Sequence, residues 1–268
     1  MVDATVRIAR ETGVVGFLNI QFAEKDGVLY VLEVNPRASR TVPFLFKSSG
    51  VNLVERAVRI WEGEDLRAQG LVDERGVGIG RCVTGWAVKE AVFSFERFTG
   101  FDPLLGPEMK STGEVIGIGA NFGEAFAKAQ ASVGTTLPTS GRVFVSVHDN
   151  DKEEVLPIVR ELVGMGFQIA ATRGTAEFLF KHGIFAEVIL KMHEGRPHLM
   201  DHLRAKRIDL LINTPLGRYS QKGDADIRIE AVKRHIPYTT TLSAARAAVE
   251  GIAYLRRKEL IVRPAPRS

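Results

Sequence analysis

Apolar and polar positions at the start of the chain predict a helix followed by a β-hairpin. Residues 1–10, MVDATVRIAR, have the spacing of an amphipathic helix, so we expect the chain to begin inside a fold. Two runs rich in β-branched and aromatic residues follow at 14–23 and 28–35. The Lys-Asp-Gly sequence between them, at 25–27, is typical of a hairpin connection.

The register of this hairpin decides which polar side chains meet. Side chains alternate along a strand, so Glu33 and Asn35 share one face. A two-residue connection would pair odd with even positions, whereas a connection of three or five residues would place Gln21 opposite Glu33. We therefore expect the longer connection, with the oxygen-bearing side chains of Gln21, Glu33 and Asn35 on a common face.

These side chains have the chemistry of a cation site. Carboxylate and amide oxygens suit Mg²⁺, which takes one or two carboxylates from a protein and relies on substrate phosphates for further ligands. Arg37 and Arg40 follow at once, and guanidinium groups beside a metal suit a site where phosphoryl charge has to be neutralised. The alternative is a hairpin with a polar face and a solvated arginine turn.

The segment from 62 to 140 has weaker patterns. One helix is predicted before it at about 52–61, and another within it at 123–131. Glycine and proline are frequent elsewhere in the segment, which indicates a connecting region. The short polar sequence GTTLPTSG at 134–141 is broken by proline and is the best linker candidate, so we place a domain boundary there.

After residue 141, short apolar runs alternate with helical segments, a pattern typical of a parallel sheet with crossover helices. We therefore expect an α/β domain with a five-stranded, mainly parallel sheet. The predicted strands are 143–148, 168–172, 186–191, 209–214 and 238–241. The predicted helices begin near residues 151, 175, 197, 224 and 243.

Polar side chains follow three of these strands at the point where each strand ends. Ligands of open α/β sheets bind outside the carboxyl ends of the strands. Thr172 and Thr175 lie between the second strand and the next helix, and the amide groups at a helix start favour an anion. Lys191 ends the third strand, and Asn213 and Thr214 end the fourth. We expect these ends to converge on an anion or a nucleotide; simple helix capping by threonine is the alternative.

Four of the histidines fall between residues 182 and 202. His198 and His202 could face one way on a helix and hold a metal ion. No cysteine joins them and Arg196 would repel a cation, so we favour scattered surface histidines or donors beside a phosphate.

Composition excludes several classes of protein. A length of 268 residues suggests two domains, and 45% hydrophobic with 25% charged residues is typical of globular chains. The 36 basic and 32 acidic residues leave a net charge of +4, too small to indicate nucleic acid binding. The single cysteine, Cys82, excludes a disulfide scaffold. Without a signal peptide or a long apolar run, we expect a cytoplasmic protein that does not bind membranes.

Three stretches of the sequence resemble a single family. They are NIQFAEKDGVLYVLEVNPRASRTVPF, GFDPLLGPEMKSTGEVIGIG and KMHEGRPHLMD. Together they closely resemble the C-terminal part of the large subunit of carbamoyl phosphate synthetase, and the resemblance covers essentially the whole chain. It implies the end of an ATP-grasp carbamate-phosphorylating unit at 1–65, a connecting region at 66–140 and a methylglyoxal-synthase-like regulatory domain at 141–268.

The resemblance also implies roles for particular residues. The ligands of Mg²⁺ or Mn²⁺ would be Gln21, Glu33 and Asn35, with Arg37 and Arg40 as anion-stabilising partners beside ATP. The residues that bind an effector nucleotide, UMP or IMP, would be Lys152, Thr172, Thr175, Lys191, Asn213 and Thr214. Ornithine, which regulates some members, would be bound by Glu90, the backbone of Leu105, Tyr238 and Thr240.

The family implies a larger enzyme around these residues. That enzyme makes carbamoyl phosphate, for arginine and pyrimidine biosynthesis, from bicarbonate, ATP and ammonia that a glutaminase small subunit supplies. Its ATP-binding lysine and most adenine contacts would precede Met1, as would further carboxylates of the ornithine site. We therefore expect this chain to act with the remainder of the large subunit and to be catalytically inactive alone.

One departure from the family and two alternative functions follow. Pro215 stands where some relatives have a second threonine, which removes a hydroxyl and an N–H donor from the nucleotide pocket. A stand-alone lyase like methylglyoxal synthase would need an aspartate base beside the phosphate, and the sequence from Glu194 to Pro197 supplies none. A module that only binds a nucleotide is the third interpretation, and it is compatible with the first.

Overall fold

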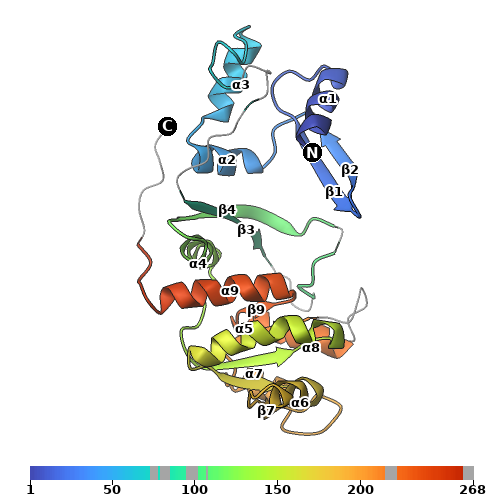
Figure 1. Cartoon of the computed structure of the whole chain (residues 1–268), viewed down its shortest axis with the longest axis vertical. Coiled ribbons are helices and arrows are strands. Elements are labelled where there is room, and N and C mark those ends of the chain that lie inside the picture. The colour runs from blue at the N-terminus through green and yellow to red at the C-terminus, as the bar shows by residue number, and fades with distance from the viewer. Residues whose placement is uncertain (73–77, 79–84, 95–101, 107, 215–221, 262–268) are drawn as a thin grey trace. The chain divides into compact units, whose positions relative to one another are not determined.

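The computed structural model describes the chain except for residues 73–77, 79–84, 95–101, 107, 215–221 and 262–268. The chain divides into two compact units (Figure 1). The first comprises Met1–Thr84 together with Val262–Ser268, and the second comprises Gly85–Ile261. Among the described residues, no helix is both long enough and apolar enough to cross a membrane. Cys82 and Pro215 lie outside the described residues.

The first unit contains the hairpin, the helices predicted at 1–10 and 52–61, and a further helix, α2, that the sequence did not predict. Its helices are α1 (Val2–Thr12), α2 (Thr41–Ser49) and α3 (Leu53–Trp61). The start of α3 follows from the side chain of Asn52, which accepts a hydrogen bond from the backbone N–H of Glu55. The helices predicted at 1–10 and 52–61 are thus confirmed.

The hairpin of β1 (Asn19–Lys25) and β2 (Val28–Asn35) has a shorter connection than predicted. Its turn consists of Asp26 and Gly27, whose φ angles of 54° and 77° are those of a tight two-residue turn. Gln21 nevertheless pairs with Glu33, because the register shifts beside Gln21 and leaves Leu32 as the extra residue of a β-bulge. The predicted pairing is right and the predicted loop length is wrong.

The second unit begins with a strand pair that the sequence did not predict. β3 (Trp86–Phe93) and β4 (Ser111–Gly119) are antiparallel, and α4 (Phe122–Ser132), predicted at 123–131, packs on them. A Cβ atom at Gly117 would collide with the backbone of Ala125, so only glycine permits this close approach of strand and helix.

The remaining strands form one parallel sheet in the order β7-β6-β5-β8-β9. They are β5 (Arg142–Ser146), β6 (Gln168–Ala171), β7 (Glu187–Val188), β8 (Leu210–Asn213) and β9 (Tyr238–Thr239). All the predicted strands are present, which confirms the α/β fold. Both β6 and β8 pair with β5, so successive strands extend first to one side of β5 and then to the other. Ligands of open sheets bind at such a reversal of strand order.

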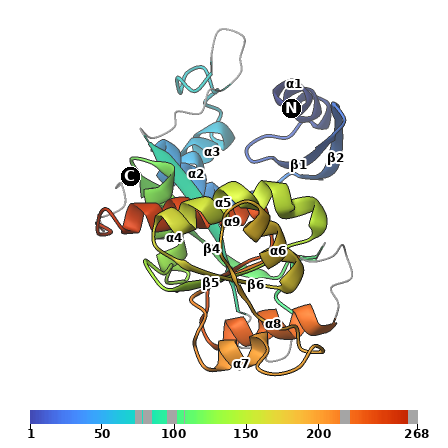
Figure 2. The same ribbon diagram turned by 60° about the horizontal axis from the view of Figure 1, so that its bottom comes forward.

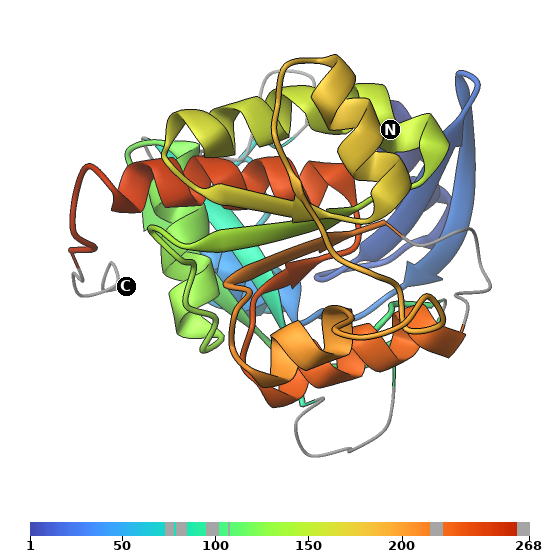
Figure 3. The same cartoon turned by 90° about the horizontal axis from the view of Figure 1, so that it is seen from below.

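Helices cover both faces of this sheet. They are α5 (Lys152–Gly164), α6 (Arg173–Lys181), α7 (Leu199–Arg204), α8 (Lys222–Lys233) and α9 (Leu242–Leu255), with a short 3-10 turn at Asp149–Asp151 before α5. Val143 and Val145 of β5 share a buried cluster with α5, α6 and α9, whereas Phe144 shares one with α7 and α8. Figure 2 and Figure 3 show these two groups of helices on opposite sides of the strands.

The segment before β5 packs into the same unit as the sheet. Helix α4 lies against α9, where a Cβ atom at Gly251 would approach Phe126 Cδ1 to 3.1 Å. The compact unit therefore starts at Gly85 rather than at the linker. The domain boundary at residues 140 and 141 lies inside this unit and stays a prediction.

Candidate functional site

A cavity of about 170 Å³ opens at the carboxyl ends of the central strands, where the strand order reverses. We name it the strand-end cavity. Its polar lining comes from the ends of four strands and the start of α8, and comprises Ser146, His148, Thr172, Lys191, His193, Asn213, Thr214 and Asp224. Four of the six residues predicted for the effector nucleotide are among them, so the predicted convergence of the strand ends is observed.

Thr172 and Thr175 form a hydroxyl pair at the start of α6. Thr172 Oγ1 donates a hydrogen bond to Thr175 Oγ1 at 3.3 Å, and Thr175 is only 2% exposed. Thr172 is the N-cap residue of α6, yet its side chain makes no capping hydrogen bond. The alternative that the Thr172 side chain only caps the helix is therefore wrong. Thr175 does not line the cavity; it contacts Thr172, which does.

Lys152 reaches the same helix start from α5. Its Nζ lies 3.7 Å from the position that a Cβ atom of Gly174 would take. Its ammonium group also pairs with Asp149 Oδ1 at 2.8 Å, and this hydrogen bond and its charge lower the pKa of Asp149. The strand-end pattern did not find Lys152. A signal existed, because a lysine in the first turn of a helix opposes the helix dipole.

Asp224, on α8, is a residue of the strand-end cavity that the sequence did not indicate. Burial raises the pKa of its carboxyl group, although the positive charges of Arg228 and Lys191 act in the opposite direction.

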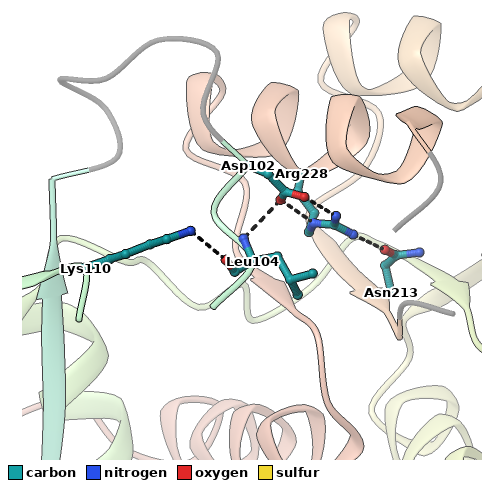
Figure 4. A network of polar contacts seen from close by, with 5 residues as sticks. All are labelled: Asp102, Leu104, Lys110, Asn213 and Arg228. Carbon is teal, nitrogen blue, oxygen red and sulfur yellow. Dashed lines mark hydrogen bonds and ion pairs between the residues drawn. The ribbon is translucent and has the colours of Figure 1, made fainter. Parts of the chain in front are cut away.

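Arg228, also on α8, connects this cavity to a distant segment of the same unit (Figure 4). Its side chain is fully buried, and Nη1 donates to Asn213 Oδ1 at 3.3 Å. Its other nitrogens hold Asp102, which precedes β4. Sequence reasoning missed both residues, although a charged residue on the apolar face of α8 beside Ala231 was a visible signal.

A second cavity, of about 340 Å³, lies between the β3-β4 pair, α4 and the end of β9. The four residues predicted for ornithine, Glu90, Leu105, Tyr238 and Thr240, all line it. Burial raises the pKa of Glu90, while a hydrogen bond with Gln130 lowers it in part. Burial also raises the pKa of Tyr238 to about 12.

The predicted metal ligands lie together on the hairpin of the first unit. Gln21 is paired with Glu33, and Asn35 Nδ2 donates to Glu33 Oε1 at 2.8 Å. Arg37 follows directly and donates from Nη1 to the carbonyl of Ala38 at 3.1 Å. Arg40 is the N-cap residue of α2. In the part of the chain that the structure describes, no group of three His, Cys, Asp or Glu side chains is placed to hold a metal ion, so a site on the hairpin would depend on the amide oxygens of Gln21 and Asn35 together with Glu33.

Known proteins resemble this chain at both ends. The family "Carbamoyl-phosphate synthase L chain, ATP binding domain" matches residues 1–69, and the family "MGS-like domain" matches residues 154–240. The carbamoyl phosphate synthase large chain of Acidobacterium capsulatum is 47% identical over 98% of this chain and 24% of its own length. The large chain of Pasteurella multocida is 45% identical over 96% of this chain and 24% of its own. This chain is a homologue of the C-terminal portion of carbamoyl phosphate synthase large chains.

The carbamoyl phosphate synthase homology agrees with the fold. The MGS-like match, at residues 154–240, includes most of the residues that line the strand-end cavity; those at the end of β5, such as Ser146 and His148, precede it. Among solved structures, methylglyoxal synthase from Elizabethkingia anophelis NUHP1 gives a TM-score of 0.36 at 20% identity, covering 42% of this chain and 79% of that one. The chain spans about a quarter of the length of its curated relatives, 24% of the first. The curated relatives named above are large chains of carbamoyl phosphate synthase and not stand-alone lyases.

Proposed function

We propose that this chain is the C-terminal part of the large subunit of a cytoplasmic carbamoyl phosphate synthase, and that the unit 85–261 binds the regulators of that enzyme. The whole enzyme would be an ATP-dependent ligase that uses bicarbonate and ammonia supplied by a glutaminase small subunit. The chain alone is expected to be inactive, because it holds only part of the nucleotide site that the family implies.

The strand-end cavity carries this proposal. Side chains from strand ends far apart in sequence meet there, and Lys191 supplies an exposed ammonium group beside the hydroxyls of Thr172 and Thr214. A cation, neutral donors and the nearby start of α6 suit a phosphate group. We assign the cavity to a nucleoside monophosphate, UMP or IMP, with Lys152 as a second cation near the phosphate.

The second cavity suits an amino acid effector such as ornithine. Glu90 provides a carboxylate for an ammonium group, and Tyr238 and Thr240 provide hydroxyl groups close by. Thr239 is a lining residue of the same cavity, and its buried Oγ1 atom has no hydrogen-bond partner among the described residues. A buried hydroxyl without a partner is costly, so a polar ligand would relieve it.

The hairpin residues fit a hard cation. Because Asn35 uses its Nδ2 group to hold Glu33, its Oδ1 atom is left for a metal ion, and Gln21 and Glu33 add oxygen ligands from one face. Gln21, Glu33 and Asn35 would hold Mg²⁺ or Mn²⁺, which would neutralise the phosphates of ATP when bound. Arg37 and Arg40 would add positive charge beside the transferred group.

Exposed apolar side chains on the hairpin support a partner surface for the remainder of the large subunit. Tyr30, Val31 and Leu32 are consecutive residues of β2, and each is about half exposed or more. Because side chains alternate along a strand, these residues expose apolar area on both faces of the hairpin, which a protein contact would cover.

Calorimetric titration of the 268-residue chain tests the proposal. We expect UMP or IMP to bind, and uridine and inosine, which lack the phosphate, to bind far more weakly. Ornithine, assigned to the other cavity, should bind whether or not a nucleotide is present. If neither nucleotide binds, or if the nucleosides bind as tightly as the nucleotides, the assignment of the strand-end cavity is wrong.

A further inference from the structure

The buried guanidinium of Arg228 lies between a neutral amide and a negatively charged carboxylate. On one side it meets the neutral amide of Asn213, which lines the strand-end cavity and is only 3% exposed. On the other side it meets the carboxylate of Asp102, to which Nε and Nη2 donate at 2.8 and 2.6 Å. One side chain therefore satisfies two partners that lie on different segments of the unit.

The chemistry of arginine fixes the orientation of Asn213. A guanidinium group carries only donors, so the amide atom that faces it has to be the oxygen. The Nδ2 group then points away from Arg228, as Figure 4 shows. Among the described residues nothing accepts a hydrogen bond from Asn213 Nδ2, so its two N–H groups remain for an acceptor in the cavity.

Asp102 holds Arg228 in this position and is itself held by its neighbours. Asp102 Oδ1 also accepts a hydrogen bond from the backbone N–H of Leu104 at 3.0 Å. The carbonyl of Leu104 accepts a hydrogen bond from Lys110 Nζ at 3.0 Å. Pro103 and Leu105, on either side of Leu104, line the second cavity. The anchor of Arg228 thus directly precedes the segment that lines that cavity.

We infer that Arg228 is a positioning residue for the strand-end cavity: anchored by Asp102, it turns the N–H groups of Asn213 toward the ligand and so ties that cavity to the segment 102–106 of the second one. The inference rests on the proposed nucleotide site. It adds that the nucleotide site binds a hydrogen-bond acceptor of the ligand at Asn213. This preference depends on the carboxylate of Asp102, which does not line the strand-end cavity.

A purely structural ion pair would have a different signature. If the pair only stabilised the fold, a variant that still folds would bind the nucleotide normally. If the pair acts through Asn213, its loss and the loss of the Asn213 amide should have the same effect on binding, and the two effects should not add.

The test uses UMP and IMP with the 268-residue chain and variants that remain foldable. The double variant Asp102→Asn/Arg228→Met removes both charges of the pair together, so that neither partner is kept without the other, and Asn at 102 can still accept from the amide of Leu104. Arg228→Lys keeps the charge, but a single ammonium group cannot reproduce the forked contacts to both partners. Asn213→Ala, alone and combined with the double variant, measures additivity. Glu161→Gln, an exposed carboxylate-to-amide change on α5, is the matched control.

We expect the double variant and Arg228→Lys each to weaken nucleotide binding about 10-fold, as does Asn213→Ala, with no further loss when Asn213→Ala is added to the double variant. Glu161→Gln should bind like the parent. Normal binding by a folded double variant or by folded Arg228→Lys overturns the inference, and so does additivity with Asn213→Ala. If the parent chain binds neither nucleotide, the proposed function and this inference both fail. If the parent binds and the variants bind equally well, only this inference fails.

Discussion

Arg228 and Asp102 form a two-pronged ion pair between positions 126 residues apart in the chain, with donor-to-acceptor distances of 2.8 and 2.6 Å. The arginine is fully buried, whereas the aspartate side chain is 29% exposed. Forked hydrogen bonds between a guanidinium and a carboxylate are among the stronger polar contacts in proteins. The geometry joins α8 to the segment before β4.

Removing only one member of this pair should destabilise the chain. Asp102→Asn removes the carboxylate that accepts from Nε and Nη2 of the buried Arg228, so we expect a loss of about 3 kcal/mol in the free energy of unfolding. The double variant Asp102→Asn/Arg228→Met should recover most of that loss. Urea unfolding followed by circular dichroism measures both, and equal stability of the two variants would contradict the expectation.

The same pair predicts a dependence on acid. Burial alone would raise the pKa of Asp102, but the hydrogen bond from Arg228, the N–H of Leu104 and the charge of Arg228 together lower it below the usual 3.8. A lowered pKa in the folded state means that the stabilisation is present above the unfolded value and is lost as the pH falls through the folded value. The stability difference between the parent and Asp102→Asn should therefore be constant near neutral pH and shrink below about pH 3.8. Unfolding curves at a series of pH values give this difference directly.

Lys191 should matter for binding but not for folding. Its side chain is exposed at the edge of the strand-end cavity, so Lys191→Ala leaves the core unchanged. Loss of a charge-assisted hydrogen bond costs about 1.5 to 3 kcal/mol, which is about 10- to 150-fold in the dissociation constant for UMP or IMP. Thr175→Ala should weaken binding less and lower stability more, because Thr175 is buried. Undiminished affinity of Lys191→Ala in calorimetry would exclude Lys191 as a phosphate ligand.

Two glycines of β4 offer a matched test of the packing of α4. A Cβ atom at Gly117 would collide with the backbone of Ala125, whereas one at Gly113 would meet Val92 at an ordinary 3.9 Å. Gly117→Ala should therefore force strand and helix apart and destabilise the unit by about 1 to 3 kcal/mol. Gly113→Ala should be neutral, or stabilising by up to about 1 kcal/mol through reduced freedom of the unfolded chain. Similar urea midpoints for the two variants would refute the close approach at Gly117.

Tyr238 should be a late-titrating tyrosine. Burial raises its pKa to about 12, with Arg228 lowering it and Asp102 raising it by smaller amounts. The unfolded chain releases this proton near pH 10, before the folded chain does, so the free energy of unfolding should fall as the pH rises from about 10 toward 12. Absorbance of tyrosinate against pH should show a late step that Tyr238→Phe removes and Tyr30→Phe, at an exposed position, retains.

Local patterns in the sequence were sufficient for much of the fold. The strands of the parallel sheet and the residues at their ends follow from short apolar runs. A strand that helices cover on both faces needs apolar side chains at nearly every position, whatever its place in the sheet. The pairing of Gln21 with Glu33 was also predicted, but for the wrong reason. No residue pattern in the sequence indicates the bulge at Leu32. The shift in register that it causes is therefore visible only once the two strands are paired in the structure.

Residues of the site that come from helices were not indicated by local patterns. Lys152 was named only through the resemblance to a family, and Asp224 and Arg228 were found only in the tertiary structure, because no pattern within their helices indicates which strand end they reach. The strand order β7-β6-β5-β8-β9 decides that, because it sets which helix starts stand beside the central strands. The sequence by itself thus determined the elements and the chemistry at the strand ends. Contacts between distant segments, such as Asp102 with Arg228, depend on packing that lies outside the reach of any local pattern.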